Sequence, residues 1–278
     1  MSSILTNTSA MNALQTLNNI NKQLDETQSR ISSGLKISSG KDNAAYYSIS
    51  ETMSSDSSMY KAIDEALTLQ MNSVSTARLG AETVQDLATE FAERVAFAQG
   101  GTAETRADVQ AELDSLIASI STTISQSSFN GDSLVDGSGT VTVVTGISRS
   151  STGSISTTTI TFNEQDLGAI MSTLASIDLT AASTTALMEV ALQTAESALN
   201  AAIASATALG IAETAIETQK EFLGTLTDNL DSGVGSMVDA DMEEEAARLQ
   251  SLQVQQQLAT QSLSIANSNP QNILSLFQ

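Results

Sequence analysis

The chain has 278 residues, with 32 acidic and 11 basic side chains, a net charge of −21, one proline and neither cysteine nor histidine. The acidic balance and the scattered cations exclude a nucleic-acid-binding surface, which needs clustered positive charge, and disfavour binding to an anionic membrane. The missing residue types exclude disulfides, thiolate chemistry and imidazole metal ligands.

The N-terminal stretch, residues 4–35, has apolar side chains at helical spacing. These are Ala10, Leu14, Leu17, Ile20, Leu24, Ile31 and Leu35. The spacing predicts an amphipathic helix with one apolar stripe. Residues 1–21 lack a basic segment followed by a continuous apolar run, so we expect no secretory signal peptide.

Residues 49–98 follow a seven-residue repeat. Steps of four and three residues from Ile49 to Ala98 meet thirteen apolar side chains in fifteen positions. The repeat predicts a long helix with a coiled-coil-like seam, roughly 75 Å long, that ends at Gly100 and Gly101. A shorter helix is expected to return antiparallel to it, with an apolar face formed by Val109, Leu113, Leu116, Ile120 and Ile124.

Residues 129–169 change character and predict a small β-hairpin insert. Two β-branched runs, Thr140–Val144 and Ser156–Phe162, alternate with turn signals at Asn130–Gly131, Asp136–Gly137 and Gly153. The polar stretch 147–161 has two interpretations, an ordinary polar hairpin or a glycosylated one. Its candidate glycosylation sites are Ser150, Ser151 and Thr152.

A third long helix is predicted over residues 192–237. The same four-and-three stepping meets eleven apolar side chains in fourteen positions, many of them alanines that allow helices to approach closely. Three helices with matching seams can bury one another and form a rod. No run of about 18 apolar residues occurs, so we expect no membrane-spanning segment.

The last predicted helix, over residues 242–266, has a stripe formed by Met242, Ala246, Leu249, Leu252, Ala259, Leu263 and Ala266. Asp239 and Asp241 are candidate N-caps, and Glu243–Glu245 lie in the first turn, where the helix dipole favours acids. Because helical side chains diverge, these acids predict no metal site. The simplest way to bury the two terminal stripes is to pair the N-terminal helix with the C-terminal one.

The C-terminal stretch has no charged residue from Gln250 to Gln278. A helix with an apolar stripe and an uncharged back needs neighbours on both sides. We therefore expect the terminal helices to form the interior of an assembly of many copies. The predicted polymer-interface residues are Leu14, Leu17, Leu24, Ile31, Leu35, Leu249, Leu252, Leu263, Ile273, Leu274 and Phe277.

Both ends of the chain resemble a known family. Residues 3–37, SILTNTSAMNALQTLNNINKQLDETQSRISSGLKI, and residues 42–50, DNAAYYSIS, resemble the N-terminal region of bacterial flagellin, in its alphaproteobacterial form. Residues 237–277, MVDADMEEEAARLQSLQVQQQLATQSLSIANSNPQNILSLF, resemble its C-terminal region, and residues 129–131 stand where the family turns from helix into hairpin.

The resemblance implies a mostly α, elongated coiled-coil-like rod with paired N- and C-terminal helices and a small β-hairpin insert. Residues 1–40 and 240–278 would line an inner tube. Residues 41–128 would form the first helices of the surrounding rod domain, and residues 170–239 would form its return helix. The implied function is self-polymerisation into the extracellular flagellar filament for swimming. The implied partners are copies of the chain, related flagellins, the cap and hook-associated proteins, an export chaperone and the flagellar type III export apparatus.

Two alternatives share parts of this pattern. A hook–filament junction protein has similar ends, and a monomeric secreted coiled-coil adhesin could have similar heptads. We expect no catalytic residue and no cofactor, because no serine has a histidine base and no histidine is present for a zinc motif.

Overall fold

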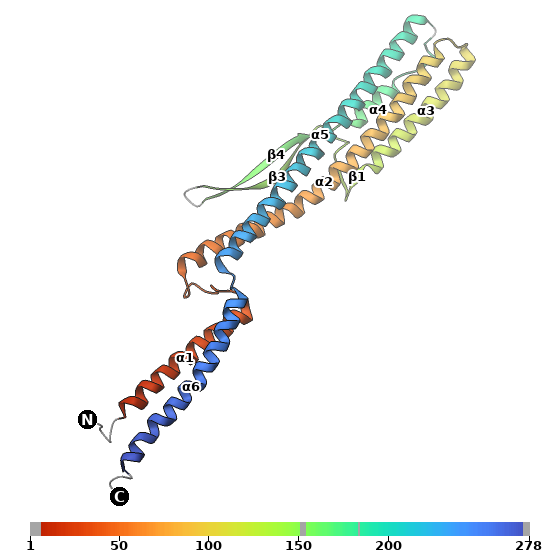
Figure 1. Ribbon diagram of the computed structural model, residues 1–278. Coiled ribbons are helices and arrows are strands. Elements are labelled where there is room, and N and C mark those ends of the chain that lie inside the picture. Colours follow the sequence, from red (N-terminus) through yellow and green to blue (C-terminus); the bar gives the residue numbers. More distant parts are fainter. Residues whose placement is uncertain (1–6, 151–153, 183, 275–278) are drawn as a thin grey trace. The chain divides into compact units, whose positions relative to one another are not determined.

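The computed structural model describes residues 7–150, 154–182 and 184–274, with side chains described up to residue 268. Six helices and four strands follow one another along these residues (Figure 1): α1 Thr8–Ser33, α2 Ala44–Ala98, α3 Ala103–Gln126, β1 Ser128–Phe129, β2 Asp132–Ser133, β3 Thr140–Arg149, β4 Ile155–Asn163, α4 Leu167–Ala175, α5 Thr185–Val238 and α6 Met242–Leu274. The predicted mostly helical fold with a small β insert is confirmed.

The chain divides into two compact units, which are described separately. One unit combines the start of the chain, up to Ser57, with its end, from Asp228 onward. The other runs from Ser58 to Thr227 and holds the central parts of both long helices together with α3, α4 and the strands.

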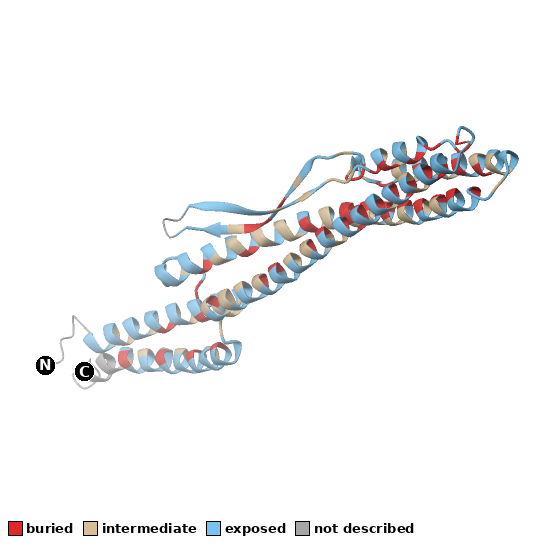
Figure 2. Ribbon diagram, turned by 90° about the horizontal axis from the view of Figure 1, so that it is seen from above, coloured by how far each residue is buried: buried red, intermediate tan, exposed pale blue. Residues whose placement is uncertain are grey.

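In the central unit, the predicted seam of α2 is confirmed from Leu67 to Ala98. Its buried residues recur at steps of three and four and are Leu67, Val74, Ala77, Ala81, Val84, Ala88, Phe91, Val95 and Ala98. Figure 2 shows such buried positions recurring along the long helices. The start of the predicted seam differs, because Ile49 is 50% exposed.

Helix α5 runs antiparallel to α2 and contributes the matching seam. Arg78 of α2 pairs with Glu213 of α5, and Lys220 Nζ donates to Thr68 Oγ1 at 2.7 Å. The seam positions predicted between residues 192 and 237 are all buried or half-buried. Helix α5 is long and apolar enough to cross a membrane by length and composition alone, features that it shares with the core helices of soluble proteins.

Helix α3 returns antiparallel to α2, as predicted. Arg94 of α2 pairs with Glu112 of α3 at 3.4 Å, and at the other end of α3 the Ser127 side chain packs against Gly80. A Cβ atom on Gly80 would lie 1.9 Å from Ser127 Oγ. Helix α2 and the end of α3 can therefore approach this closely only because position 80 is a glycine.

Helix α4 is a feature that sequence analysis missed, since residues 170–239 were assigned to one return helix. The Asp166 side chain accepts a hydrogen bond from Ala169 N at 2.8 Å and starts α4, whose Leu167 and Leu174 are fully buried. The Asp178 carboxylate then accepts from Thr180 N at 2.8 Å and turns the chain before α5 begins. The assigned segment is therefore two helices.

The strands form two antiparallel pairs, β1 with β2 and β3 with β4. Asn130 and Gly131 have φ values of 52° and 86°, which is the conformation of a tight hairpin turn, so the predicted turn is confirmed. The predicted strands are confirmed as β3 and β4, with a bulge between Val144 and Gly146. Side chains of the two long helices hold β3, since Tyr60 Oη donates to Ile147 O and Gln219 Nε2 donates to Thr145 O.

Candidate assembly surface

Helices α1 and α6 pack side by side and antiparallel, so the predicted pairing of the chain ends is confirmed (Figure 1). Three polar contacts mark their register. Asn7 Nδ2 donates to Ala266 O at 2.8 Å, Gln256 Nε2 donates to Asn21 Oδ1 at 2.7 Å, and Arg30 pairs with Glu245 at 3.1 Å. These contacts keep one antiparallel register along the described pair.

The seam between the two helices is a heptad repeat in both. The seam positions of α1 are all buried or half-buried and are Ala10, Ala13, Leu17, Ile20, Leu24, Thr27 and Ile31, with the half-buried Asn21 and Arg30 beside them. The seam positions of α6 are likewise buried or half-buried and are Glu245, Leu249, Leu252, Gln256, Ala259, Leu263 and Ala266. Both sets step alternately by three and four residues, which is the spacing of a coiled-coil seam.

This seam corrects the stripe that the sequence predicted for the last helix. Met242 is 46% exposed and Ala246 is also exposed, whereas Glu245 is only 6% exposed. The predicted stripe consists of apolar residues only, whereas the observed seam of α6 also includes the polar side chains of Glu245 and Gln256. A search for strict heptad spacing, regardless of polarity, would have found the seam.

Both helices begin with a capping side chain. Asn7 Oδ1 accepts from Ala10 N at 3.1 Å at the start of α1. Asp241 Oδ1 accepts from Glu243 N at 3.0 Å and from Glu244 N at 3.1 Å, which confirms this aspartate as the cap of α6. No cap contact is described for the other candidate, Asp239, which instead forms a backbone bridge with Leu35.

The base of the pair is closed by the segments next to the helices. Gly34, with φ 74°, ends α1 in the left-handed conformation, and its carbonyl accepts from Ala240 N at 2.9 Å. Lys36 N donates to Val238 O at 2.6 Å. Beyond it, hydrogen bonds from the Ser38 backbone N–H and the Ser39 hydroxyl lower the pKa of Asp42.

The end of the pair farther from this base has no charge and exposes apolar side chains. We call it the uncharged half and define it as residues 7–21 of α1 and 250–268 of α6, which include no acidic or basic residue. Its exposed large apolar side chains, with their exposed fractions, are Met11 (64%), Leu14 (49%), Val254 (55%), Leu258 (61%) and Ile265 (59%).

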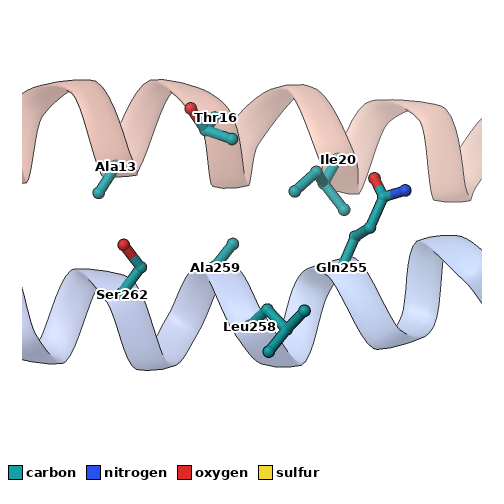
Figure 3. Close-up of a pocket in the computed structure, with 7 residues that line it drawn as sticks. All are labelled: Ala13, Thr16, Ile20, Gln255, Leu258, Ala259 and Ser262. Atoms are coloured by element: carbon teal, nitrogen blue, oxygen red, sulfur yellow. The ribbon is translucent and has the colours of Figure 1, made fainter.

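A shallow groove of about 360 Å³ lies on the uncharged half. Figure 3 shows its lining, in which Ala13 lies opposite Ser262 and Ile20 lies opposite Gln255. Leu258 and Ala259 line the groove on the α6 side, together with Gln255 and Ser262. The uncharged half therefore presents both a recess and exposed apolar side chains.

The predicted interface residues fall into three groups. Leu14 is exposed and available to a neighbour. The half-buried or buried residues, which face the paired helix or its base, are Leu17, Leu24, Ile31, Leu35, Leu249, Leu252 and Leu263. The side chains of Ile273 and Leu274 and the whole of Phe277 lie outside the described residues, as do Ser151 and Thr152, whereas Ser150 is exposed.

Most of the exposed apolar surface was not predicted from the sequence. Met11, Val254, Leu258 and Ile265 stand off the predicted stripes. The signal was present, because Val254, Leu258 and Ile265 follow one another at steps of four and seven within the uncharged part of α6. A second apolar stripe on a paired helix indicates a second neighbour.

The match to known proteins covers most of the chain. The pattern of the bacterial flagellin N-terminal helical region matches residues 4–140, and that of the bacterial flagellin C-terminal helical region matches residues 192–277. Together they include both helices of the uncharged half. The chain belongs to the bacterial flagellin family. It is a structural subunit of the bacterial flagellar filament, the organelle of swimming motility.

Flagellins of alphaproteobacteria are similar to this family member over its full length. A flagellin of Brucella melitensis is 40% identical, with 100% of each chain covered. Flagellin C of Rhizobium meliloti is 34% identical, again with both chains covered completely. Flagellin FljO of Caulobacter vibrioides is 36% identical, over 100% of this chain and 99% of the relative.

The family is one of structural proteins. Within the described part of the chain, no group of three or more acidic side chains is arranged to hold a metal ion. The expectation that the chain has no catalytic residue and no cofactor stays a prediction.

Proposed function

We propose that copies of this filament subunit assemble through the uncharged half of the α1–α6 pair. The observation that carries the proposal is the exposure of Leu14, Leu258 and Ile265 on helices whose inner faces are already occupied by each other. Burying apolar surface contributes roughly 25 cal/mol per Å², so a polymer contact here would be stabilising.

Electrostatics supports the same surface. Each copy has a net charge of −21, so copies repel one another at most approaches. The uncharged half avoids this repulsion. Of the 32 acidic residues, twenty lie between Ser58 and Thr227, away from it in the sequence.

The proposed division of labour follows the family resemblance. Residues 1–40 and 240–278 form the inner tube, residues 41–128 and 170–239 form the rod domain, and the insert 129–169 faces outward, where Ser150, Ser151 and Thr152 are candidate glycosylation sites. The compact unit that contains both chain ends extends further, to Ser57 and from Asp228. Ile273, Leu274 and Phe277 extend the proposed contact toward the end of the chain.

The proposed partners and location also follow from family membership. Besides its own copies and related flagellins, the subunit meets the cap and hook-associated proteins, an export chaperone and the flagellar type III export apparatus. It works outside the cell in the filament, binds no nucleic acid, inserts in no membrane and has no enzymatic activity.

The experiment is seeded elongation of purified monomer, followed by sedimentation and electron microscopy. Leu258→Asp places a charge on the exposed surface of α6 and is expected to abolish elongation, because the aspartate would be buried without a partner. Ile155→Asp is the matched control, since Ile155 is an exposed isoleucine of β4, 49% exposed, in the other unit. Normal filaments from Leu258→Asp would contradict the proposal.

A further inference from the structure

At the end nearest the base, the α1–α6 pair contains an ion pair with a buried carboxylate, Glu245, and a half-buried guanidinium, Arg30, whose side chain is 30% exposed. The side chain of Glu245 is 7% exposed and its Oε1 lies 3.1 Å from Arg30 Nη1 of α1 and 3.8 Å from Arg248 Nη1 of α6. Arg248 also pairs with Glu244 at 3.3 Å on the surface. A groove beside the pair has Arg30, Glu244, Arg248 and Glu26 among its lining residues.

This arrangement is a poor source of stability. The second carboxylate oxygen of Glu245 is buried without a hydrogen-bond partner among the described residues. A buried ion pair with an unsatisfied oxygen loses much of its attraction to the cost of desolvation. The best-attested use of such polar groups in helical seams is the selection of one register.

The apolar positions of the seam select register weakly. Because the repeat is seven residues long, a slip of one heptad would set Ile20 near Leu249 or Leu263 and keep apolar against apolar. The backbone hydrogen bonds at the base hold the two segments together, but every residue has the same backbone groups, so other residues could replace them.

The ion pair is what a slip would break. With Arg30 opposite Glu245, a slip of one heptad would set Arg30 against Leu252 in one direction and Glu245 against Gln23 in the other. Either slip would separate Glu245 from Arg30 and leave Arg248 of its own helix, 3.8 Å away, as the cation nearest to the buried carboxylate. Losing the closer partner is costly for a buried charge. Among the three polar contacts across the described pair, only this one involves opposite charges.

We infer that Glu245, with Arg30, is the positioning residue that selects the register of the α1–α6 pair. The inference rests on the proposed function, because the register decides which exposed side chains of α1 and α6 lie next to each other on the assembly surface. In the observed register, Met11 and Ile265 lie close to the level at which Asn7 meets Ala266. A slipped pair would offer the next copy a different surface.

The chain itself provides a clean test, because it has no cysteine and an introduced pair reports only its own proximity. Ala13→Cys with Ser262→Cys links the observed register, since these positions face each other (Figure 3). Ala13→Cys with Gln255→Cys and Ile20→Cys with Ser262→Cys report slips of one heptad in either direction. Filaments assembled from each double variant are oxidised, and the link within one chain is separated from links between chains by gel mobility.

With Glu245 present, we expect only the Ala13–Ser262 pair to link. Adding Glu245→Leu is expected to lower the yield of that link at least twofold and to raise one of the slipped links. The charge swap of Arg30→Glu with Glu245→Arg is expected to restore the original pattern. Glu243→Gln, which removes one exposed acid from the same turn, is the matched control and is expected to change nothing.

The outcomes separate this inference from the proposed function. If Glu245→Leu assembles and still gives only the Ala13–Ser262 link, the register inference is overturned while the assembly surface stands. If Glu245→Leu does not assemble, the swapped chain decides, because filaments with the original link support the inference and their absence contradicts it. Failure of the cysteine variants with Glu245 to elongate seeds at all would count against the assembly surface instead.

Discussion

At the scale of single residues, a few side chains decide where long helices can meet. Gly80 permits the close approach of α2 and α3. Polar contacts such as the hydrogen bond from Lys220 to Thr68 fix which residues of two paired helices lie opposite each other. These positions contribute little apolar burial, so their role is to exclude other arrangements. Hydrophobic patterning alone gives them no weight, which is why the sequence analysis did not select them.

Gly80→Ala tests the close crossing. The added methyl group would lie 1.9 Å from Ser127 Oγ and 2.6 Å from its Cβ, so something must shift. We expect a loss of about 1–3 kcal/mol in the free energy of unfolding, as for other overpacked positions. Gly224→Ala in α5 is the control, because nothing lies within 4 Å of its added methyl group, and it should gain about 0.5–1 kcal/mol from helix propensity. Equal shifts of both variants in urea denaturation would refute this account.

At the scale of elements, long periodic patterns were predicted well and short ones poorly. The seams of α2 and α5 were found because seven-residue spacing recurs over many turns, and tertiary packing reinforces it. Helix α4 was missed because it has only nine residues and is defined by the capping of Asp166 and the turn at Asp178. The stripe of α6 was misplaced because Glu245 and Gln256 occupy seam positions, where a charge or amide is unexpected.

The turn between α4 and α5 yields a pH-dependent prediction. A hydrogen bond from the Thr180 hydroxyl, with others from the Ala181 and Thr180 backbone N–H groups, lowers the pKa of Asp178 from its model-compound value of 3.8. A carboxyl group with a lowered folded-state pKa contributes stability above its unfolded pKa, and the contribution is lost as pH falls through the folded one. Asp178→Asn should therefore destabilise the protein at pH 7 and have less effect at a pH below 3.8, where the contribution begins to be lost.

Urea denaturation of both chains at the two pH values measures this difference. Thr180→Ala removes the hydroxyl that donates to Asp178 Oδ1 at 2.6 Å and should move the stability in the same direction. A destabilisation by Asp178→Asn that stays the same size at both pH values would show that the charge is not what holds the turn.

At the scale of the whole molecule, charge and apolar surface are segregated along the sequence. The uncharged half of the terminal pair has no ionisable side chain, while twenty acidic and six basic residues lie between Ser58 and Thr227. The sequence was sufficient to predict that the helices at the two chain ends pair with each other. It was not sufficient to predict which side chains point outward, because that depends on the pairing of α1 with α6, which occupies one stripe and leaves the other exposed.

This segregation predicts that salt favours assembly. Copies with a net charge of −21 repel one another, and the Debye length falls from about 30 Å at 0.01 M to about 8 Å at 0.15 M ionic strength. The apolar contact itself depends little on salt in this range, so screening should lower the monomer concentration that remains unpolymerised. We expect a severalfold drop between the two conditions, measured by sedimentation of seeded reactions.

The matched variant neutralises three exposed acids of the central unit, Asp86→Asn, Glu93→Gln and Asp108→Asn, which changes the net charge from −21 to −18. Its salt dependence should be shallower than that of the parent chain, because the repulsion between copies grows with the product of their charges. If the concentration of unpolymerised monomer instead rises with salt, attraction between opposite charges must dominate the contact. The uncharged half has no charges to provide such attraction, so this result would contradict the proposed surface.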